Sequence, residues 1–425
     1  MVDVLVGKSL NGLNGEIEIP ADKSISHRAV MFSSLAKGKS LIKNFSSGAD
    51  PHSTLNVFSK LGIEYKFLDA KTLEIVSDGC LKTPLENLDC GNSGTTMRLM
   101  SGILAGQNFD SVLIGDESLS KRPMKRVIEP ITLMGGQIKA QDGHAPLKIT
   151  GTRLHGVDYV SMLASAQVKS CVLLAGLFAD GVTSFTEPAI SRNHTELMLK
   201  YLGADLSVEG KKVSVRPSGL VAKEIEICGD ISSAAFFIVA GLIVPNSDIV
   251  LKNVGLNPTR AGILEVVRKM GGNIEILDER EISGEVVGDI RVRYSELKGC
   301  EICGEIIPRL IDELPVIAVL ATQAQGQTTV RDAGDLRNKE ADRISALVYE
   351  LKKIGVEIEE LPDGFVVSGK QQIKGGAEVE VYHDHRLAMS FYVAGLIAEN
   401  EILIKEFQWV DISFPEFLSL FEQIK

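Results

Sequence analysis

The chain alternates between short polar segments, rich in glycine and serine, and longer apolar segments. At 90–98, small polar residues and two glycines run directly into the apolar segment 99–105, whose spacing predicts a buried helix. The first N–H groups of a helix have no partner inside it and carry the positive end of its dipole, so an anion fits there. Taken alone this junction is weak evidence, because many polar loops cap helices without binding a ligand.

Similar polar-to-apolar junctions recur along the chain at intervals of roughly 70 residues, which indicates an internal repeat. After each junction the pattern predicts an apolar helix, a short strand and a second, amphipathic helix, which in most repeats ends at a glycine such as Gly62 or Gly135. A pair of strands follows in all but the last repeat. The junctions lie around Ser24, Ser93, Ser165, Ser232, Asp312 and Asp384.

The two ends of the sequence complement each other. The last repeat has no strand pair after it, whereas two strand-like segments, 2–6 and 16–19, precede the first repeat without a helix of their own. We therefore expect the N-terminal segments to complete the last repeat. This predicts an α/β (α+β) protein with two domains of three repeats each, the first over 21–227 and the second over 1–20 together with 228–425.

The composition is typical of a globular protein, with 425 residues, 44% of them hydrophobic and 24% charged. A net charge of −11 argues against nucleic acid as a partner. No apolar segment reaches the ~18 residues that cross a bilayer, and no basic-then-apolar leader is evident, so we expect no membrane contact and a cytoplasmic location. The cysteines are scattered except for Cys300 and Cys303, which favours reduced thiols over a metal site. We expect neither a metal nor an organic cofactor, because no ligand cluster or dinucleotide motif is present.

Against this acidic background, a set of basic residues lies in or beside the junctions. If the junctions of the two domains face one another across a cleft, these cations converge and would hold small, highly charged anions. For any single one of them the alternative is a solvated surface cation that pairs along its own helix. The set comprises Lys23, Arg28, Arg98, Arg122, Arg192, Arg337, Lys339, Arg343 and Arg386.

The junctions also carry six motifs, in order along the chain. They are KSISHR at 23–28, GNSGTTMR at 91–98, KRP at 121–123, SAQVKS at 165–170, RNKEADR at 337–343 and DHR at 384–386. Together they closely resemble the 5-enolpyruvylshikimate-3-phosphate synthase family, over essentially the whole chain. The resemblance implies transfer of the enolpyruvyl group of phosphoenolpyruvate to the 5-hydroxyl of shikimate 3-phosphate, with release of phosphate. It also implies three βαβαββ repeats in each domain, arranged as an inside-out α/β barrel, which agrees with the repeat count.

Position in these motifs implies which residues bind each substrate. Those implied for shikimate 3-phosphate are Lys23, Ser24, Arg28, Ser165, Gln167, Arg192, Asp312 and Lys339. Those implied for phosphoenolpyruvate are Lys23, Gly94, Arg122, Gln167, Arg343 and Arg386. The first domain would bind mainly shikimate 3-phosphate, and the second mainly phosphoenolpyruvate. A side chain at Gly94 would intrude on the space of phosphoenolpyruvate, which is also how family members resist glyphosate.

The same resemblance implies that Asp312, Glu340 and Lys23 are the catalytic residues, with Lys23 as the lysine that touches both substrates. Asp312 would accept the proton of the 5-hydroxyl as this group attacks C2 of phosphoenolpyruvate. Glu340 would protonate the methylene carbon and later remove a proton from the resulting methyl group, which regenerates the enol ether. General acid–base catalysis of this kind typically contributes ~10²–10⁴-fold in rate.

Some positions depart from the best-known form of the family and resemble its second, divergent class. Ala166 stands where many members have a second serine, and Leu99 replaces a proline. Ile412 stands where many members carry a lysine that binds phosphoenolpyruvate, so this site is less defined than the shikimate site. In the divergent class, Arg192 would take over part of the contact with the shikimate phosphate. Because Gly94 is retained, we expect partial glyphosate tolerance at most.

Two alternatives stay open. The enolpyruvyl transferase that acts on UDP-N-acetylglucosamine resembles Lys-Asn at the first junction and places a cysteine near the donor. Here the first junction is Lys23-Ser24, and 111–124 contains no cysteine. The other alternative is a non-catalytic anion-binding protein of the same fold, against which the presence of both Asp312 and Glu340 argues. We expect a monomer whose partners are small anionic substrates.

Overall fold

The computed structural model describes residues 2–425, which form two compact units. The N unit comprises Ala21–Ile227 together with Ile282–Glu285. The C unit comprises the chain up to Pro20, Cys228–Glu281 and Val286–Lys425. The chain therefore begins in the C unit, builds nearly the whole of the N unit, and then returns to the C unit.

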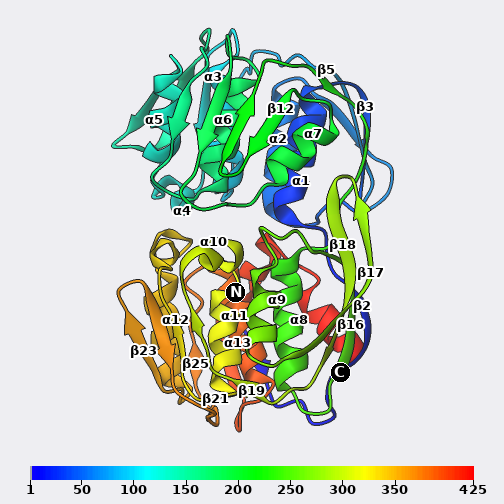
Figure 1. Cartoon of the computed structure of the whole chain (residues 1–425), viewed down its shortest axis with the longest axis vertical. Helices are drawn as coiled ribbons and strands as arrows, with labels where there is room; N and C mark the ends of the chain where they lie inside the picture. Colours follow the sequence, from blue (N-terminus) through cyan, green and yellow to red (C-terminus); the bar gives the residue numbers. More distant parts are fainter. Residues whose placement is uncertain (1) are drawn as a thin grey trace. The chain divides into compact units, whose positions relative to one another are not determined.

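The N unit repeats one arrangement three times (Figure 1). In each copy a short strand pairs in parallel with the strand that follows a buried helix, and that strand pairs antiparallel with one arm of a hairpin. The helices are α1 (Lys23–Leu35), α2 (Ala49–Lys60), α3 (Gly94–Ala105), α4 (Glu117–Ser120), α5 (Lys125–Leu133), α6 (Ala166–Gly176) and α7 (His194–Tyr201). The strands are β3 (Ala36–Lys43), β4 (Glu64–Phe67), β5 (Leu73–Asp78), β6 (Leu88–Asp89), β7 (Ser111–Ile114), β8 (Gln137–Gln141), β9 (His144–Thr150), β10 (Asp158–Val160), β11 (Thr183–Thr186), β12 (Leu206–Glu209), β13 (Lys212–Val215), β14 (Leu220–Val221) and β15 (Glu224–Glu226). The three sheets have the strand orders β14-β3-β5-β4, β6-β7-β9-β8 and β10-β11-β13-β12.

The C unit has the same plan with more variation. Its helices are α8 (Ile231–Ile243), α9 (Gly262–Lys269), η1 (Gly304–Ile306), α10 (Ile307–Leu310), α11 (Leu314–Thr322), η2 (Gly334–Asn338), α12 (Arg343–Lys353), α13 (His385–Gly395), η3 (Phe407–Ile412) and α14 (Phe417–Ile424). Its strands are β1 (Val4–Val6), β2 (Asn14–Glu18), β16 (Asp248–Gly255), β17 (Asn273–Ile282), β18 (Glu285–Arg293), β19 (Leu297–Lys298), β20 (Glu301–Ile302), β21 (Ala324–Gln325), β22 (Thr328–Val330), β23 (Ile358–Leu361), β24 (Gly364–Val367), β25 (Glu378–Val379) and β26 (Ile402–Ile404). The sheets have the strand orders β17-β18-β16-β2, β20-β22-β24-β23, β1-β26-β25 and β19-β21.

The two N-terminal strands divide between different repeats. β1 pairs antiparallel with β26 of the last repeat, with Val4 opposite Ile404, as the sequence predicted. β2 instead pairs in parallel with β16 of the fourth repeat, with Ile17 opposite Leu251. The expectation that both segments complete the last repeat is therefore wrong for β2. All sheets of the described residues stay open at their edges, so the barrel is one of separate sheets around helices and not a closed ring of strands.

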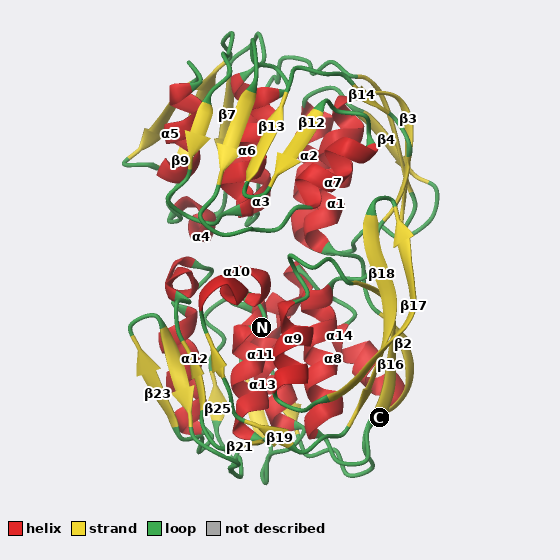
Figure 2. Ribbon diagram, viewed as in Figure 1, coloured by secondary structure: helices red, strands yellow, loops and turns green. Residues whose placement is uncertain are grey.

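One long helix of each repeat lies in the core of its unit. These helices are α1, α3 and α6 in the N unit and α8, α11 and α13 in the C unit, with sheets on the outside of each unit (Figure 2). All 13 residues of α8 are buried, as expected for a helix that is apolar around its whole circumference. Among residues 2–425, no helix has the length and apolar character that a bilayer span requires.

Side chains at the junctions cap five of the six core helices of the described chain. The side-chain oxygen accepts a backbone N–H of the first turn, which satisfies a donor that has no partner within the helix. The exception is α11, which begins at Leu314 without a side-chain cap, so Asp312 lies in the turn between α10 and α11. The capping residues are Asp22, Ser93, Ser165, Asp230 and Asp384.

Candidate functional site

The first turn of α1 presents Lys23 and Ser24 at the N-terminal end of a buried helix. Lys23 is the first residue of α1, and its Nζ lies 3.1 Å from Asp50 Oδ2 of α2. Both side chains are partly buried, with exposed fractions of 19% and 12%. The ion pair holds the lysine at the helix start, where the dipole adds to its positive charge.

Arg28 follows Ser24 by one turn of α1 and is buried. Its guanidinium donates to Ser24 O at 2.9 Å, to Thr195 Oγ1 at 2.7 Å and to Ser170 Oγ at 2.9 Å. The bonds to Ser170 and Thr195 join α1 to α6 and α7, and all three acceptors are neutral oxygens. Burial lowers the pKa of Arg28 to about 10, so the group is a cation at neutral pH.

The start of α3 brings a glycine and two arginines together. A Cβ atom added to Gly94 would lie 3.2 Å from Arg122 Nη1 and 3.3 Å from Arg98 Nη1. Arg98 Nη1 donates to Gln167 Oε1 at 2.5 Å, and Gln167 Nε2 donates to Thr95 Oγ1 at 3.0 Å. A helix N-terminus flanked by two guanidinium groups suits phosphate or carboxylate. Three residues implied by the motifs, Gly94, Arg122 and Gln167, thus share one region of the N unit with Arg98, to which the motifs had assigned no role.

Ser165 and Arg192 flank the same side of the N unit from α6 and from the segment before α7. Ser165 Oγ caps α6 by accepting Val168 N at 3.5 Å. Arg192 is half-buried, and its positive charge adds to burial in lowering the pKa of Arg28. Two guanidinium groups close enough to affect each other can be bridged by an anion.

In the C unit the guanidinium of Arg343 lies at the centre of three carboxylates. Its Nε lies 2.5 Å from Asp384 Oδ2, its Nη1 lies 3.2 Å from Asp312 Oδ1, and its Nη2 contacts Glu340 Oε2. The Arg343 side chain is 2% exposed. Burial opposes the charge of Arg343, but Asp384, Glu340 and Asp312 together raise its pKa above the ordinary value. The two carboxylates implied to move protons are therefore held on one permanent cation.

Asp312 is also approached by two other implied residues. Lys339 Nζ lies 3.5 Å from Asp312 Oδ1, and it is shared with Asp335 Oδ2 at 3.5 Å. Arg386 Nη1 donates to Asp312 O at 3.3 Å, and Arg386 Nη2 lies 3.9 Å from Asp312 Oδ2. The C unit thus brings together all the residues that the motifs implied for it. Asp384, which the motifs had left without a role, fixes Arg343 and caps α13 at Arg386 N, 2.9 Å away.

Arg337 shows that a basic residue at a junction need not belong to this cluster. It donates to Asp342 Oδ2 and Glu360 Oε1, each at 2.8 Å, and to the carbonyls of Leu361 and Pro362. These bonds fasten η2 and α12 to the β23–β24 hairpin. The expectation that all nine junction cations converge is therefore wrong for Arg337, whose partners are structural.

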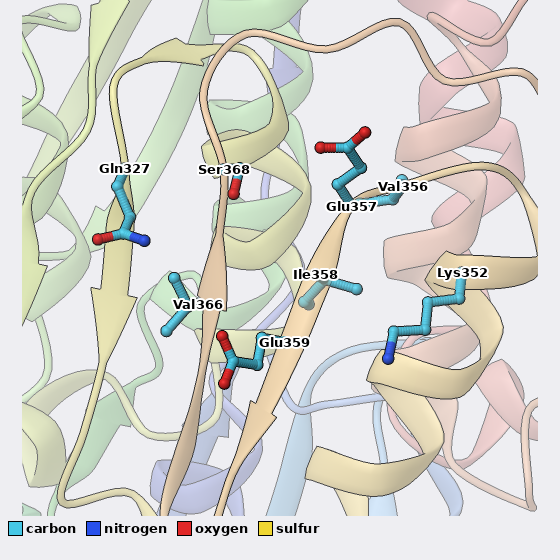
Figure 3. A pocket seen from close by; sticks show the side chains of 8 residues that line it. All are labelled: Gln327, Lys352, Val356, Glu357, Ile358, Glu359, Val366 and Ser368. Carbon is cyan, nitrogen blue, oxygen red and sulfur yellow. The ribbon is translucent and has the colours of Figure 1, made fainter.

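A separate hollow of about 420 Å³ lies on the C unit beside this hairpin (Figure 3). Lys352, which lines it, lies near the end of α12, roughly 14 Å along the helix from Arg343 at its start. Its lining contains none of the implied substrate residues. The lining residues are Gln327, Lys352, Val356, Glu357, Ile358, Glu359, Val366 and Ser368.

The cysteines and the described acidic and histidine residues fit no metal centre. All six cysteines are free, including Cys300 and Cys303. Within residues 2–425, no group of three or more His, Cys, Asp or Glu residues is arranged to hold a metal ion. His27, in the first motif, is fully buried with Nδ1 2.7 Å from Thr54 Oγ1, so it is a core residue of the N unit.

The family model and the curated relatives agree on one family. The family model described as EPSP synthase (3-phosphoshikimate 1-carboxyvinyltransferase) matches residues 8–421. The chain is 51% identical over 412 residues to the 3-phosphoshikimate 1-carboxyvinyltransferase of Bacillus subtilis (strain 168), covering 95% of this chain and 96% of the relative. It is 50% identical over 421 residues to that of Geotalea uraniireducens (strain Rf4), covering 98% of each.

Solved structures confirm the predicted fold class. The EPSP synthase of Acinetobacter baumannii superposes with a TM-score of 0.89 at 42% identity, covering 99% of this chain and 97% of that one. The enolpyruvyl transferase NikO of Streptomyces tendae superposes with a TM-score of 0.82 at 15% identity, covering 99% and 97%. The second likeness concerns the fold alone.

Proposed function

The chain belongs to the EPSP synthase family, and from this premise we propose that it transfers the enolpyruvyl group of phosphoenolpyruvate to the 5-hydroxyl of shikimate 3-phosphate and releases phosphate. This is the 3-phosphoshikimate 1-carboxyvinyltransferase reaction of aromatic amino acid biosynthesis. The observation that carries the proposal is the arrangement of Asp312 and Glu340 on the Arg343 guanidinium, because the reaction needs a base and an acid at different atoms.

We propose an addition followed by an elimination. Asp312 takes the proton of the 5-hydroxyl while the oxygen bonds to C2 of phosphoenolpyruvate, and Glu340 gives a proton to C3, which becomes a methyl group. In the second step the bond from C2 to the phosphate oxygen breaks, and Glu340 takes back a methyl proton as the double bond forms again. The proton held by Asp312 leaves with the departing phosphate, so both carboxyl groups return to their starting states. Lys339, 3.5 Å from Asp312, supports the ionised carboxylate that the first step requires.

The substrate roles proposed for the remaining residues follow the chemistry of each group. In the N unit, Lys23, Ser24, Arg28, Ser165, Gln167 and Arg192 bind shikimate 3-phosphate, with Asp312 and Lys339 from the C unit. The residues proposed to bind phosphoenolpyruvate are Lys23, Gly94, Arg122 and Gln167 of the N unit and Arg343 and Arg386 of the C unit. Cations and helix N-termini suit the phosphate and carboxylate groups of both substrates. On this proposal 21–227 binds mainly shikimate 3-phosphate, and 1–20 with 228–425 mainly binds phosphoenolpyruvate.

The direct test is phosphate release from phosphoenolpyruvate, measured in parallel with shikimate 3-phosphate and with UDP-N-acetylglucosamine. Release only with shikimate 3-phosphate is expected. Release only with the nucleotide sugar would show that shikimate 3-phosphate is not the acceptor. Release with neither compound would favour a non-catalytic anion-binding protein.

Variants separate the acid–base groups from other carboxylates of the C unit. Asp312→Asn and Glu340→Gln should each lower kcat by about 10²–10⁴-fold, because each removes a group that moves a proton. The matched control is Glu359→Gln on β23, whose exposed carboxylate lines the separate hollow and should leave kcat unchanged. A rate near that of the wild type in Glu340→Gln would contradict the assignment of the acid.

We also propose that the chain acts as a monomer in the cytoplasm. Two features support this: each unit has its own buried core, and all six cysteines are free, as is usual in a reducing compartment. Size-exclusion chromatography with light scattering, and fractionation of cells that express the chain, test the two statements separately.

A further inference from the structure

A lysine buried in the N unit pairs with two carboxylates that take no part in the proposed chemistry. Lys169 of α6 is 1% exposed, and its Nζ lies 2.8 Å from Glu187 Oε1 and 2.7 Å from Glu196 Oε1. The glutamates are 3% and 5% exposed. Removing three charged groups from water is costly and stabilises the fold little by itself, so such a cluster calls for another explanation.

The cluster of Lys169, Glu187 and Glu196 makes hydrogen bonds to Ser191, the residue that precedes Arg192. Lys169 Nζ donates to Ser191 O at 3.2 Å, and this carbonyl belongs to the peptide bond between Ser191 and Arg192. Glu187 Oε1 accepts Ser191 N at 3.0 Å, and Glu187 Oε2 accepts Ser191 Oγ at 2.5 Å. The backbone on the N-terminal side of Arg192 is thus fixed through both its N–H and its carbonyl.

The other side of Arg192 is fixed by α7. Glu196, in the first turn of α7, holds that helix against Lys169 of α6. The neighbouring residues make a parallel contact, because Ser170 Oγ of α6 lies 2.6 Å from Thr195 Oγ1 of α7. Arg192 therefore stands between two anchors, Ser191 and Glu196, which meet on one ammonium group.

We propose that Lys169 is a positioning residue for the acceptor substrate: through Glu187, Ser191 and Glu196 it aims the Arg192 guanidinium at the phosphate of shikimate 3-phosphate. The inference rests on the proposed function and extends it to groups that touch no substrate. The two buried glutamates on either side of Arg192 in sequence, both held by Lys169, leave the backbone at Arg192 few alternative conformations. An arginine that is already held in its binding position loses less conformational entropy when it binds a phosphate.

The test must distinguish an effect on the position of Arg192 from an effect on the stability of the N unit. Lys169→Met removes the lysine that both buried carboxylates share and can unfold the N unit. The informative variant is therefore Lys169→Met/Glu187→Gln/Glu196→Gln, in which the three charges disappear together. We expect it to raise KM for shikimate 3-phosphate about tenfold, while kcat and KM for phosphoenolpyruvate change less than about threefold. The matched control is Lys212→Met/Asp158→Asn, which removes an exposed ion pair of the same unit and should change none of these constants.

A double-mutant cycle decides whether the effect passes through Arg192. If Lys169 acts by aiming Arg192, the triple substitution should add less than about twofold to KM in an Arg192→Ala background. Fully additive effects, or an equal rise in both KM values, would overturn the inference. A wild-type protein that releases no phosphate with shikimate 3-phosphate would overturn the proposed function, and this inference with it. An active wild type with additive variants would overturn the role of Lys169 alone.

Discussion

Arg28 of the N unit and Arg343 of the C unit are both buried, yet opposite kinds of partner hold them. Arg28 donates to one carbonyl and two hydroxyl oxygens, whereas Arg343 pairs with Asp312, Glu340 and Asp384. Burial lowers the pKa of Arg28 by more than the nearby charges of Glu196, Asp22 and Glu285 raise it. For Arg343, the three carboxylates outweigh burial and raise the pKa. A cation among neutral oxygens keeps its charge for a bound anion. A cation among carboxylates is already compensated and fixes those carboxylates in place.

The largest effect should come from Arg343→Met. It leaves three acidic side chains in a buried site without their shared cation, and breaking such a pair typically costs about 3–5 kcal/mol in the free energy of unfolding. Turnover should be lost together with stability. Urea unfolding followed by the fluorescence of Trp409, the one tryptophan of the chain, measures this in the C unit.

Lys370→Met is the control for this substitution, because it removes a lysine of the C unit from an exposed pair with Glu296. A surface pair of this kind contributes about 0–1 kcal/mol. If Arg343→Met cost no more than Lys370→Met, Arg343 would not be the centre of the carboxylate cluster, and the comparison with Arg28 would fail.

Arg28→Met should act on binding more than on folding. The oxygens it leaves behind are neutral, and a charge-assisted bond to phosphate is worth about 1.5–3 kcal/mol, or roughly a 10- to 150-fold rise in KM for shikimate 3-phosphate. KM for phosphoenolpyruvate should change much less. Steady-state kinetics with each substrate varied in turn checks this, and a loss of kcat with both KM values unchanged would speak against a binding role.

Gly94→Ala should have a smaller and more selective effect. The new Cβ would lie 3.2–3.3 Å from the guanidinium nitrogens of Arg122 and Arg98, which are ends of flexible side chains and can shift by a few tenths of an ångström. KM for phosphoenolpyruvate should rise severalfold at most, because cation positions change while the charges stay. A matched rise in KM for shikimate 3-phosphate would show that Gly94 does not face the donor. Inhibition by glyphosate, measured for the wild type and for Gly94→Ala, tests the expected partial tolerance.

Much of the fold could be predicted because it depends on local patterns. Ser93 before the apolar run of α3 and the glycines that end the second helices mark the repeats without any knowledge of neighbours. Strand pairing is different, since the alternation of β2 tells which face is buried and not which strand lies beside it. This is why β2 was assigned to the last repeat, although it pairs with β16.

Motifs in the sequence predicted which residues belong to the candidate site. They did not predict which ion pairs and hydrogen bonds those residues make. Arg337 and Arg343 occur in one motif, and composition gives no means of separating them. Only the structure shows that Arg337 binds the β23–β24 hairpin while Arg343 binds Asp384, 41 residues away in sequence. The same holds for Lys169 and Glu187, because a buried lysine in an apolar helix carries no signal that names its partners.

His27 gives the smallest and last comparison, because this buried base of the N unit has a hydroxyl partner and no carboxylate. Burial, together with the charges of Lys23 and Arg28, lowers its pKa well below 6.5. Its contribution to stability is therefore complete above pH 6.5 and is lost as the pH falls below that value, since only the unfolded chain takes up the proton. Between pH 6.5 and 5.5 the wild type should lose about 1 kcal/mol more than His27→Gln in the free energy of unfolding. Urea titrations followed by circular dichroism at both pH values measure the difference, with His155→Gln at an exposed position as control; equal losses in wild type and His27→Gln would mean that a carboxylate compensates His27 after all.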